Sequence, residues 1–223
     1  MSSIRAIQEL ADVKDPAWPE LRELVRWATV PVTVLPPDPE RARDTLIRLQ
    51  VTARSTLGAL ALNTGGILVD YGWLRILGGG SAELPDLATS NGVRRPGELP
   101  TDALIVAVDV LGGRFAVNGG ELPGEPGEVC YFGPDTLAWN PIGFGHSAFV
   151  HWALGGGTAE FYEDLRWPDW HYEIRTLTLG QGISVYPPLW TVEGRTDIGA
   201  ASRCAAPMSE VIALLVATAK TLH

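Results

Sequence analysis

Cysteine, lysine and histidine are scarce in this chain of 223 residues. Cys130 and Cys204 are the only cysteines, which excludes a framework of several disulfides and a zinc site made of four cysteines. The only lysines are Lys14 and Lys220, and neither follows a glycine-rich loop as the phosphate-binding lysine of a P-loop does. The four histidines include no H-E-x-x-H pair. These shortages remove the most easily recognised metal and nucleotide sites, and we predict no cofactor.

Long apolar runs are also missing. No uninterrupted stretch approaches the roughly 20 residues that a membrane-spanning helix needs, and the opening MSSIRAIQELADVKD lacks the apolar centre of a signal peptide. The formal net charge of -9 opposes binding to nucleic-acid phosphates. We therefore expect a cytoplasmic protein with no membrane or nucleic-acid partner. Its acidic surface suits a basic protein, and solubility alone explains that surface equally well.

Apolar residues make up 46% of the chain, which is enough for a substantial core. Helical patterns come first, a cluster of strands follows, and helices close the chain. The predicted strands are 29–36, 57–62, 67–70, 73–77, 103–110, 114–118, 128–132 and 135–140. This order predicts a single α+β domain over residues 1–223, with a central antiparallel or mixed sheet and N-terminal and C-terminal helices packed around it.

Four residues are expected to cap helices. Ser3 precedes the apolar spacing of Ile4, Ile7 and Leu10. Asp15 and Asp38 each precede a proline, which is typical of a cap followed by the first helical residue. Thr158 is expected to cap the helix of TAEFYEDLRW.

The segment 109–132, DVLGGRFAVNGGELPGEPGEVCYF, is rich in glycine. A phosphate-binding loop would open a helix, but here the following EVCYF has the pattern of a strand. Glu121, Glu125 and Glu128 would repel a phosphate. The glycines therefore predict turns between antiparallel strands.

No catalytic motif stands out in the chain. His146 and His151 are five residues apart, which does not place them on one helix face. The nearest match to G-x-S-x-G is GFGHS at 143–147, where the serine follows His146. Cys130 has the surroundings of a core residue, and Cys204 has only Arg203 beside it.

Two segments have the composition of recognition surfaces. DYGWLRILGGG (70–80) and SVYPPLWTVEGR (184–195) place aromatic residues and an arginine next to turns, and such residues are enriched in binding hot spots. In the alternative interpretation, Trp73 and Trp190 are core residues. The candidate binding residues are Asp70, Trp73, Arg75, Tyr186 and Trp190.

Several long stretches resemble a bacterial family known as domain of unknown function 2625. They are DPAWP (15–19), NTGGILVDYGWLRILG (63–78), most of 108–154, FYEDLRWPDW (161–170) and QGISVYPPLW (181–190). The order of strand, glycine turn, RFAVN, second turn, EVCYF and helix also resembles the centre of the SUKH superfamily. That resemblance implies an α+β binding module of the kind that bacterial immunity proteins use against toxins.

Three hypotheses for function follow. The first is a non-enzymatic protein-binding module of immunity or regulatory type. The second is a small-molecule-binding protein or a hydrolase with its site at the rim of the central sheet, where His146 or His171 would meet a carboxylate. The third is a homo-oligomer, a dimer whose interface uses the tryptophans.

Overall fold

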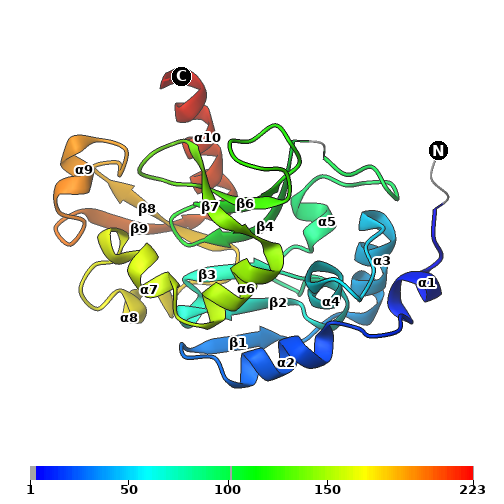
Figure 1. The fold of residues 1–223 in the computed structure, drawn as a ribbon. Helices are drawn as coiled ribbons and strands as arrows, with labels where there is room; N and C mark the ends of the chain where they lie inside the picture. The colour runs from blue at the N-terminus through cyan, green and yellow to red at the C-terminus, as the bar shows by residue number, and fades with distance from the viewer. Residues whose placement is uncertain (1–3, 101, 223) are drawn as a thin grey trace.

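A computed structural model describes residues 4–100 and 102–222 and contains one seven-stranded antiparallel sheet (Figure 1). The strands are neighbours in chain order, from β1 at one edge to β7 at the other. Their bounds are Val32–Leu35 (β1), Gly66–Val69 (β2), Leu74–Leu77 (β3), Ala103–Asp109 (β4), Arg114–Asn118 (β5), Glu128–Phe132 (β6) and Trp139–Gly145 (β7). A separate antiparallel pair consists of β8 (Gln181–Tyr186) and β9 (Ser202–Pro207). The predicted α+β class is confirmed.

Helices surround the sheet, as predicted (Figure 1). Their bounds are Ile7–Ala11 (α1), Trp18–Arg26 (α2), Pro39–Leu49 (α3), Thr56–Asn63 (α4), Leu87–Ser90 (α5), His146–Leu154 (α6), Thr158–Phe161 (α7), Trp170–Ile174 (α8), Val192–Thr196 (α9) and Met208–Leu222 (α10). Two 3-10 turns are Asp70–Gly72 (η1) and Glu163–Leu165 (η2). In the part of the chain that the structure describes, no helix is long and apolar enough to cross a membrane.

The two faces of the sheet carry different residues. Directly paired residues share a face, and one row across the central strands is Ile76, Ala107, Phe115 and Tyr131. Phe115 packs against Phe149 of α6, with ring centroids 4.8 Å apart. The row on the opposite face is Arg75, Val108, Arg114, Phe132 and Trp139. That face meets α10, because Phe132 clusters with Leu215.

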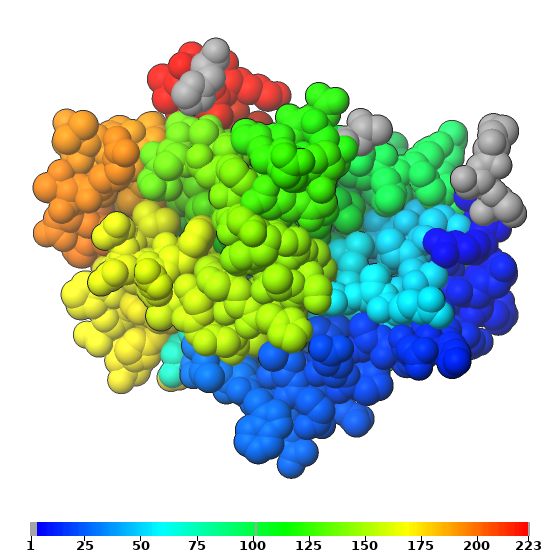
Figure 2. Space-filling model, viewed as in Figure 1, coloured from blue at the N-terminus to red at the C-terminus, as the bar shows by residue number. Residues whose placement is uncertain are grey.

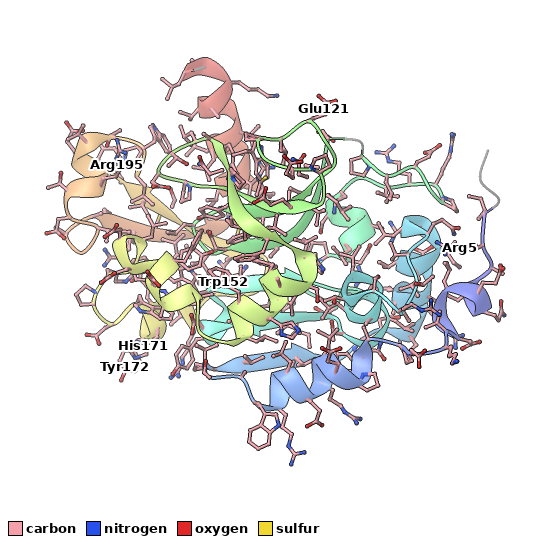
Figure 3. The ribbon with its side chains drawn as sticks, in the orientation of Figure 1. Arg5, Glu121, Trp152, His171, Tyr172 and Arg195 are labelled. Carbon is pink, nitrogen blue, oxygen red and sulfur yellow. The ribbon has the colours of Figure 1, made fainter. Side chains whose placement is uncertain are left out.

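The predicted turns between antiparallel strands are confirmed. Gly112 lies between β4 and β5 with φ of 83°, a conformation that glycine adopts readily. Residues 119–127 connect β5 to β6, and the Asn118 side-chain carbonyl accepts the Gly120 N–H at 2.7 Å. Glu121 points outward from this loop (Figure 3). The loop opens no helix.

Of the four predicted caps, Ser3 lies outside the described residues, and one of the other three is confirmed. The Asp38 carboxylate accepts the N–H groups of Glu40 and Arg41 at 3.0 and 3.1 Å. The prediction for Asp15 is wrong, because α2 begins at Trp18 with Ala17 at the N-cap. The prediction for Thr158 is also wrong, since its hydroxyl turns inward to donate a hydrogen bond to Asp70.

The strand prediction failed at several points. Residues 57–62 belong to α4, where the Ser55 hydroxyl accepts the Gly58 N–H at 3.1 Å and caps the helix. The last predicted strand of the main sheet starts later, at Trp139. β9, α5 and α9 were not predicted.

Candidate functional site

A buried ion pair joins the end of β2 to the segment after η2. Asp70 Oδ2 accepts hydrogen bonds from Arg166 Nη2 and from the Thr158 hydroxyl, both at 2.6 Å. The side chains of Asp70 and Arg166 are only 8% and 11% exposed. Asp70 and Tyr71 have φ of 51° and 60°, which side-chain-bearing residues rarely adopt. The ion pair therefore holds a strained turn in place.

Aromatic rings enclose the Arg166 guanidinium. Its central carbon lies 4.2 Å from the Trp170 ring centroid, 5.0 Å from that of Trp73 and 5.4 Å from that of Tyr162. We call these three rings with Arg166 and Asp70 the Arg166 box. Aromatic faces attract a cation, so the box stabilises the guanidinium together with Asp70.

A second buried carboxylate, Asp109, lies at the end of β4. Asp109 Oδ2 accepts from the Tyr131 and Tyr162 hydroxyls at 2.7 and 3.1 Å, and Oδ1 accepts from the N–H groups of Leu111 and Gly113, both at 2.9 Å. Burial raises the pKa of Asp109, and the four hydrogen bonds oppose that rise. Tyr162 thereby links this carboxylate to the Arg166 box.

Glycine at position 113 allows this close packing. A Cβ there would lie 2.2 Å from Asp109 Oδ2 and 2.4 Å from the Tyr131 hydroxyl oxygen. The Gly-Gly turn is therefore required by the buried carboxylate as well as by the chain reversal.

Arg75 is buried on the other face of the sheet, with 2% of its surface exposed. Its Nη1 donates to the Leu179 carbonyl at 2.6 Å, and its Nε donates to the Gly72 carbonyl at 3.3 Å. Burial lowers the pKa of Arg75 to about 10, and the charge of Asp109 opposes this change. Its polar atoms therefore bind segments of its own chain.

The Arg166 box and Asp109, linked through Tyr162, form an internal network. This network reaches the surface at a polar cleft of about 880 Å³, beside Arg166. The cleft lies between the η2 region and the segment from α9 to β9. Its lining mixes charges of both signs, from Asp135, Glu163, Asp164, Arg166, Arg195, Asp197 and Arg203. Arg195 marks the α9 side of this region in Figure 3. No histidine is among the residues that line the cleft.

An apolar groove of about 140 Å³ lies between β8, the segment after it and α10. Tyr186 and Leu214 line it and are 72% and 52% exposed. Trp190 lines it too, and packs partly buried against the cluster of Phe132 and Leu215. We call it the Tyr186 groove.

The five predicted binding residues lie in three places. Asp70 and Trp73 belong to the Arg166 box, and Trp73 is fully buried. Arg75 lies under the opposite face of the sheet, beside Leu179. Tyr186 and Trp190 lie together in the Tyr186 groove. The structure thus brings together two pairs and does not form one site from all five.

The described histidines and cysteines form no cluster. Within 4–100 and 102–222, His146 and His171 make no hydrogen bond or ion pair with a carboxylate, and no three potential metal ligands gather. His171 lies among aromatic rings near α8, at the edge of the molecule in Figure 3. Cys130 is buried and Cys204 is exposed.

His146 at the start of α6 should make stability depend on pH. Its Nε2 is buried without a hydrogen bond, and burial lowers its pKa from 6.5 to about 4. Because the folded pKa is the lower one, the contribution to stability is present above 6.5 and is lost as the pH falls toward 4. We expect this residue to cost up to about 2 kcal/mol of unfolding free energy between pH 7 and pH 5.

Urea unfolding of wild type and His146→Phe at the two pH values measures this effect. The variant should lose less stability at low pH than wild type. His151→Phe, at an exposed position of the same helix, should keep the wild-type dependence. Equal pH dependence in wild type and His146→Phe would contradict the prediction.

Sequence reasoning missed Asp109, Tyr162 and Arg166 as members of the internal network. Asp109 gave a signal, because it is an acid that ends the apolar strand ALIVAVDV just before two glycines. Arg166 gave a weaker signal, as a cation between aromatic residues in FYEDLRWPDW. Tyr162 gave none.

Comparison with known proteins identifies relatives along most of the chain. A family model described as "Protein of unknown function DUF2625" matches residues 7–211. An uncharacterised Escherichia coli K12 protein, YbfG, is 40% identical over 195 residues, which cover 86% of this chain and 90% of that protein. An uncharacterised Haemophilus influenzae Rd protein is 35% identical over 189 residues, which cover 83% and 82%. No solved structure matches the chain.

Proposed function

Because the chain belongs to the DUF2625 family, whose description assigns no activity, we propose its function from its own geometry: a module that binds a basic protein partner through the Tyr186 groove. The observation that carries this proposal is the grouping of exposed apolar side chains at one place. Tyr186 on β8 and Leu214 on α10 both line the groove, and Trp190 packs partly buried against the cluster of Phe132 and Leu215.

The residue types of the groove suit protein recognition. Tyrosine and tryptophan dominate binding hot spots, because each buries a large area with few rotatable bonds. Trp190 is held by Phe132 and Leu215, so a partner would meet a side chain that is already positioned. A preorganised aromatic residue loses little entropy on binding.

Charge favours a basic partner. The chain carries a net charge of -9. This net negative charge accelerates the encounter with a cationic partner and disfavours an anionic one.

The groove lies at an accessible part of the molecule. α10 extends beyond the neighbouring segments in the views of Figures 1 and 2, and its C-terminal end points away from the sheet. An immunity-type or regulatory-type role is the form of this function that the resemblance to the SUKH superfamily implies.

Photo-crosslinking from the groove tests the proposal. A photoreactive amino acid at Leu214 is expected to form a covalent adduct with a basic protein in cells, which mass spectrometry identifies. With that protein purified, Tyr186→Ala and Trp190→Ala should each weaken binding by about tenfold or more. Tyr172→Ala removes a tyrosine that is 63% exposed on α8 and should leave the affinity unchanged.

Two results would refute this function. In the first, Leu214 crosslinks only to other copies of the chain, which would favour the homodimer. In the second, the crosslinked protein binds wild type and the two groove variants equally.

A further inference from the structure

A second apolar cavity lies between the sheet and the first turns of α10, and it is independent of the proposed function. Its volume is about 360 Å³. The apolar walls include Leu77, Leu84, Ile105, Val108, Met208 and Ile212. A cavity of roughly 150 Å³ holds a benzene-sized molecule, so this one has room for a larger ligand.

One charged residue, Arg114, lines this cavity. Its Nε is buried and has no hydrogen-bond partner, and its guanidinium forms no ion pair with any residue in 4–100 or 102–222. The guanidinium carbon lies 5.0 Å from the Phe132 ring centroid and 5.5 Å from that of Trp139. These two rings hold the side chain in place but accept no hydrogen bond from Nε.

Arg75 provides an internal comparison, because it belongs to the same row of the sheet. Its guanidinium is satisfied by the carbonyls of Gly72 and Leu179, and the charge of Asp109 favours its charged form. Burial lowers the pKa of Arg114 as well, and no carboxylate opposes that change. Of the two arginines on this face, Arg75 is therefore held by backbone carbonyls of its own chain, whereas the partly buried Arg114 has no acceptor or counterion among the described residues.

A second unpaired group lines the same cavity. The Ser90 hydroxyl is buried without a hydrogen bond. Buried polar groups in folded proteins nearly always have a partner, so each exception requires an explanation. The lining of this cavity therefore includes two residues with a polar group that has no hydrogen-bond partner among the described residues.

From these observations we propose that the cavity binds a small monocarboxylate with an apolar chain or ring. The carboxylate would pair with the Arg114 guanidinium, and the apolar part would contact Val108, Met208 and Ile212. A carboxylate has only acceptors and matches the planar guanidinium. With one cation in the lining, the site balances a single negative charge, which favours a carboxylate over a phosphate dianion.

The start of α10 favours the same ligand. Met208 and Ser209, the first residues of this 15-residue helix, line the cavity. The N-terminal end of a helix carries a partial positive charge that attracts anions. This contribution adds to that of Arg114.

Isothermal titration calorimetry of the full chain with octanoate, decanoate and phenylacetate tests the site. At least one acid is expected to bind, and the alcohol of the same carbon skeleton should bind about tenfold to a hundredfold more weakly, because it lacks the charge that pairs with Arg114. Arg114→Met should remove most of this preference. Ile212→Trp should abolish binding of both compounds by filling the cavity.

The control is Arg26→Met, since the Arg26 side chain is 71% exposed on α2 and should not affect binding. Failure of all three acids to bind at millimolar concentration would overturn the proposal, as would equal binding of an acid and its alcohol. If Arg114→Met does not fold, the comparison of acid with alcohol on wild type and the Ile212→Trp variant still decide the question.

Discussion

Replacing Asp70 with alanine is expected to lower the free energy of unfolding by about 3–5 kcal/mol, the range for a buried ion pair that loses one partner. The substitution leaves the Arg166 guanidinium buried without its carboxylate and removes the acceptor of the Thr158 hydroxyl. Alanine also tolerates the φ of 51° at this position less well than aspartate does. Urea unfolding followed by tryptophan fluorescence measures the loss, since Trp73 and Trp170 surround Arg166.

The double variant Asp70→Ala with Arg166→Met distinguishes the energetic cost of the unpaired Arg166 charge from the cost of the lost contacts. It should be less destabilised than the sum of the single variants, because no unpaired guanidinium remains. Glu98→Ala breaks the exposed pair with Arg95 and serves as the control, with an expected change below about 1 kcal/mol. An Asp70→Ala variant as stable as Glu98→Ala would show that the buried pair contributes nothing to the fold.

The sequence predicted the central strands because their patterns are local. RFAVN and EVCYF form β5 and β6 with the predicted bounds, and the almost entirely apolar ALIVAVDV provides β4, fourth of the seven strands. Glycines between these runs supply the positive φ that chain reversal needs. Both the strands and the turns can therefore be recognised from neighbouring residues in the sequence alone.

The failure at α4 has a physical reason. TLGALALN carries apolar residues in almost every position, and four consecutive residues from Gly58 to Ala61 are buried. A helix buried on several sides shows no polar face, so its pattern is the same as that of a buried strand. The cap at Ser55 was the only local signal of a helix.

β9 escaped prediction for a different reason. SRCAAP has no apolar alternation, and most of its residues are exposed. The segment is a strand because it pairs with β8 over six positions. When an edge strand is stabilised by pairing with its neighbour, its own sequence shows little of the pattern typical of a strand.

The internal network depends on pairs far apart in the chain. The sequence indicates Asp70 as a candidate residue because it lies beside a turn, but its partner Arg166 is 96 positions away. Asp109 and Tyr162 are 53 positions apart. A single sequence contains no signal that joins such residues, so the candidate residues could be picked singly but their partners could not. The extent of the chain as one domain stays a prediction.

Asp109→Ala is expected to cost about 4 kcal/mol or more of unfolding free energy, because it deprives several buried donors of their acceptor at about 1–3 kcal/mol each. Those donors are the Tyr131 and Tyr162 hydroxyls and the N–H groups of Leu111 and Gly113. Tyr162→Phe removes one donor and keeps the carboxylate, so it should cost only about 1 kcal/mol. Thermal and urea unfolding of both variants test the ranking.

Asp109→Asn keeps the shape of the side chain and removes its titration. Since burial raises the pKa of Asp109 above its unfolded value, the contribution of this residue to stability is complete below the unfolded pKa and is lost as the pH rises through the folded pKa. The asparagine side chain does not titrate, so the variant does not lose stability in this way as the pH rises. Its stability relative to wild type should therefore improve as the pH is raised from 4 toward 7. A stability difference that stays constant over this range would mean that the four hydrogen bonds compensate fully for the burial of the carboxylate.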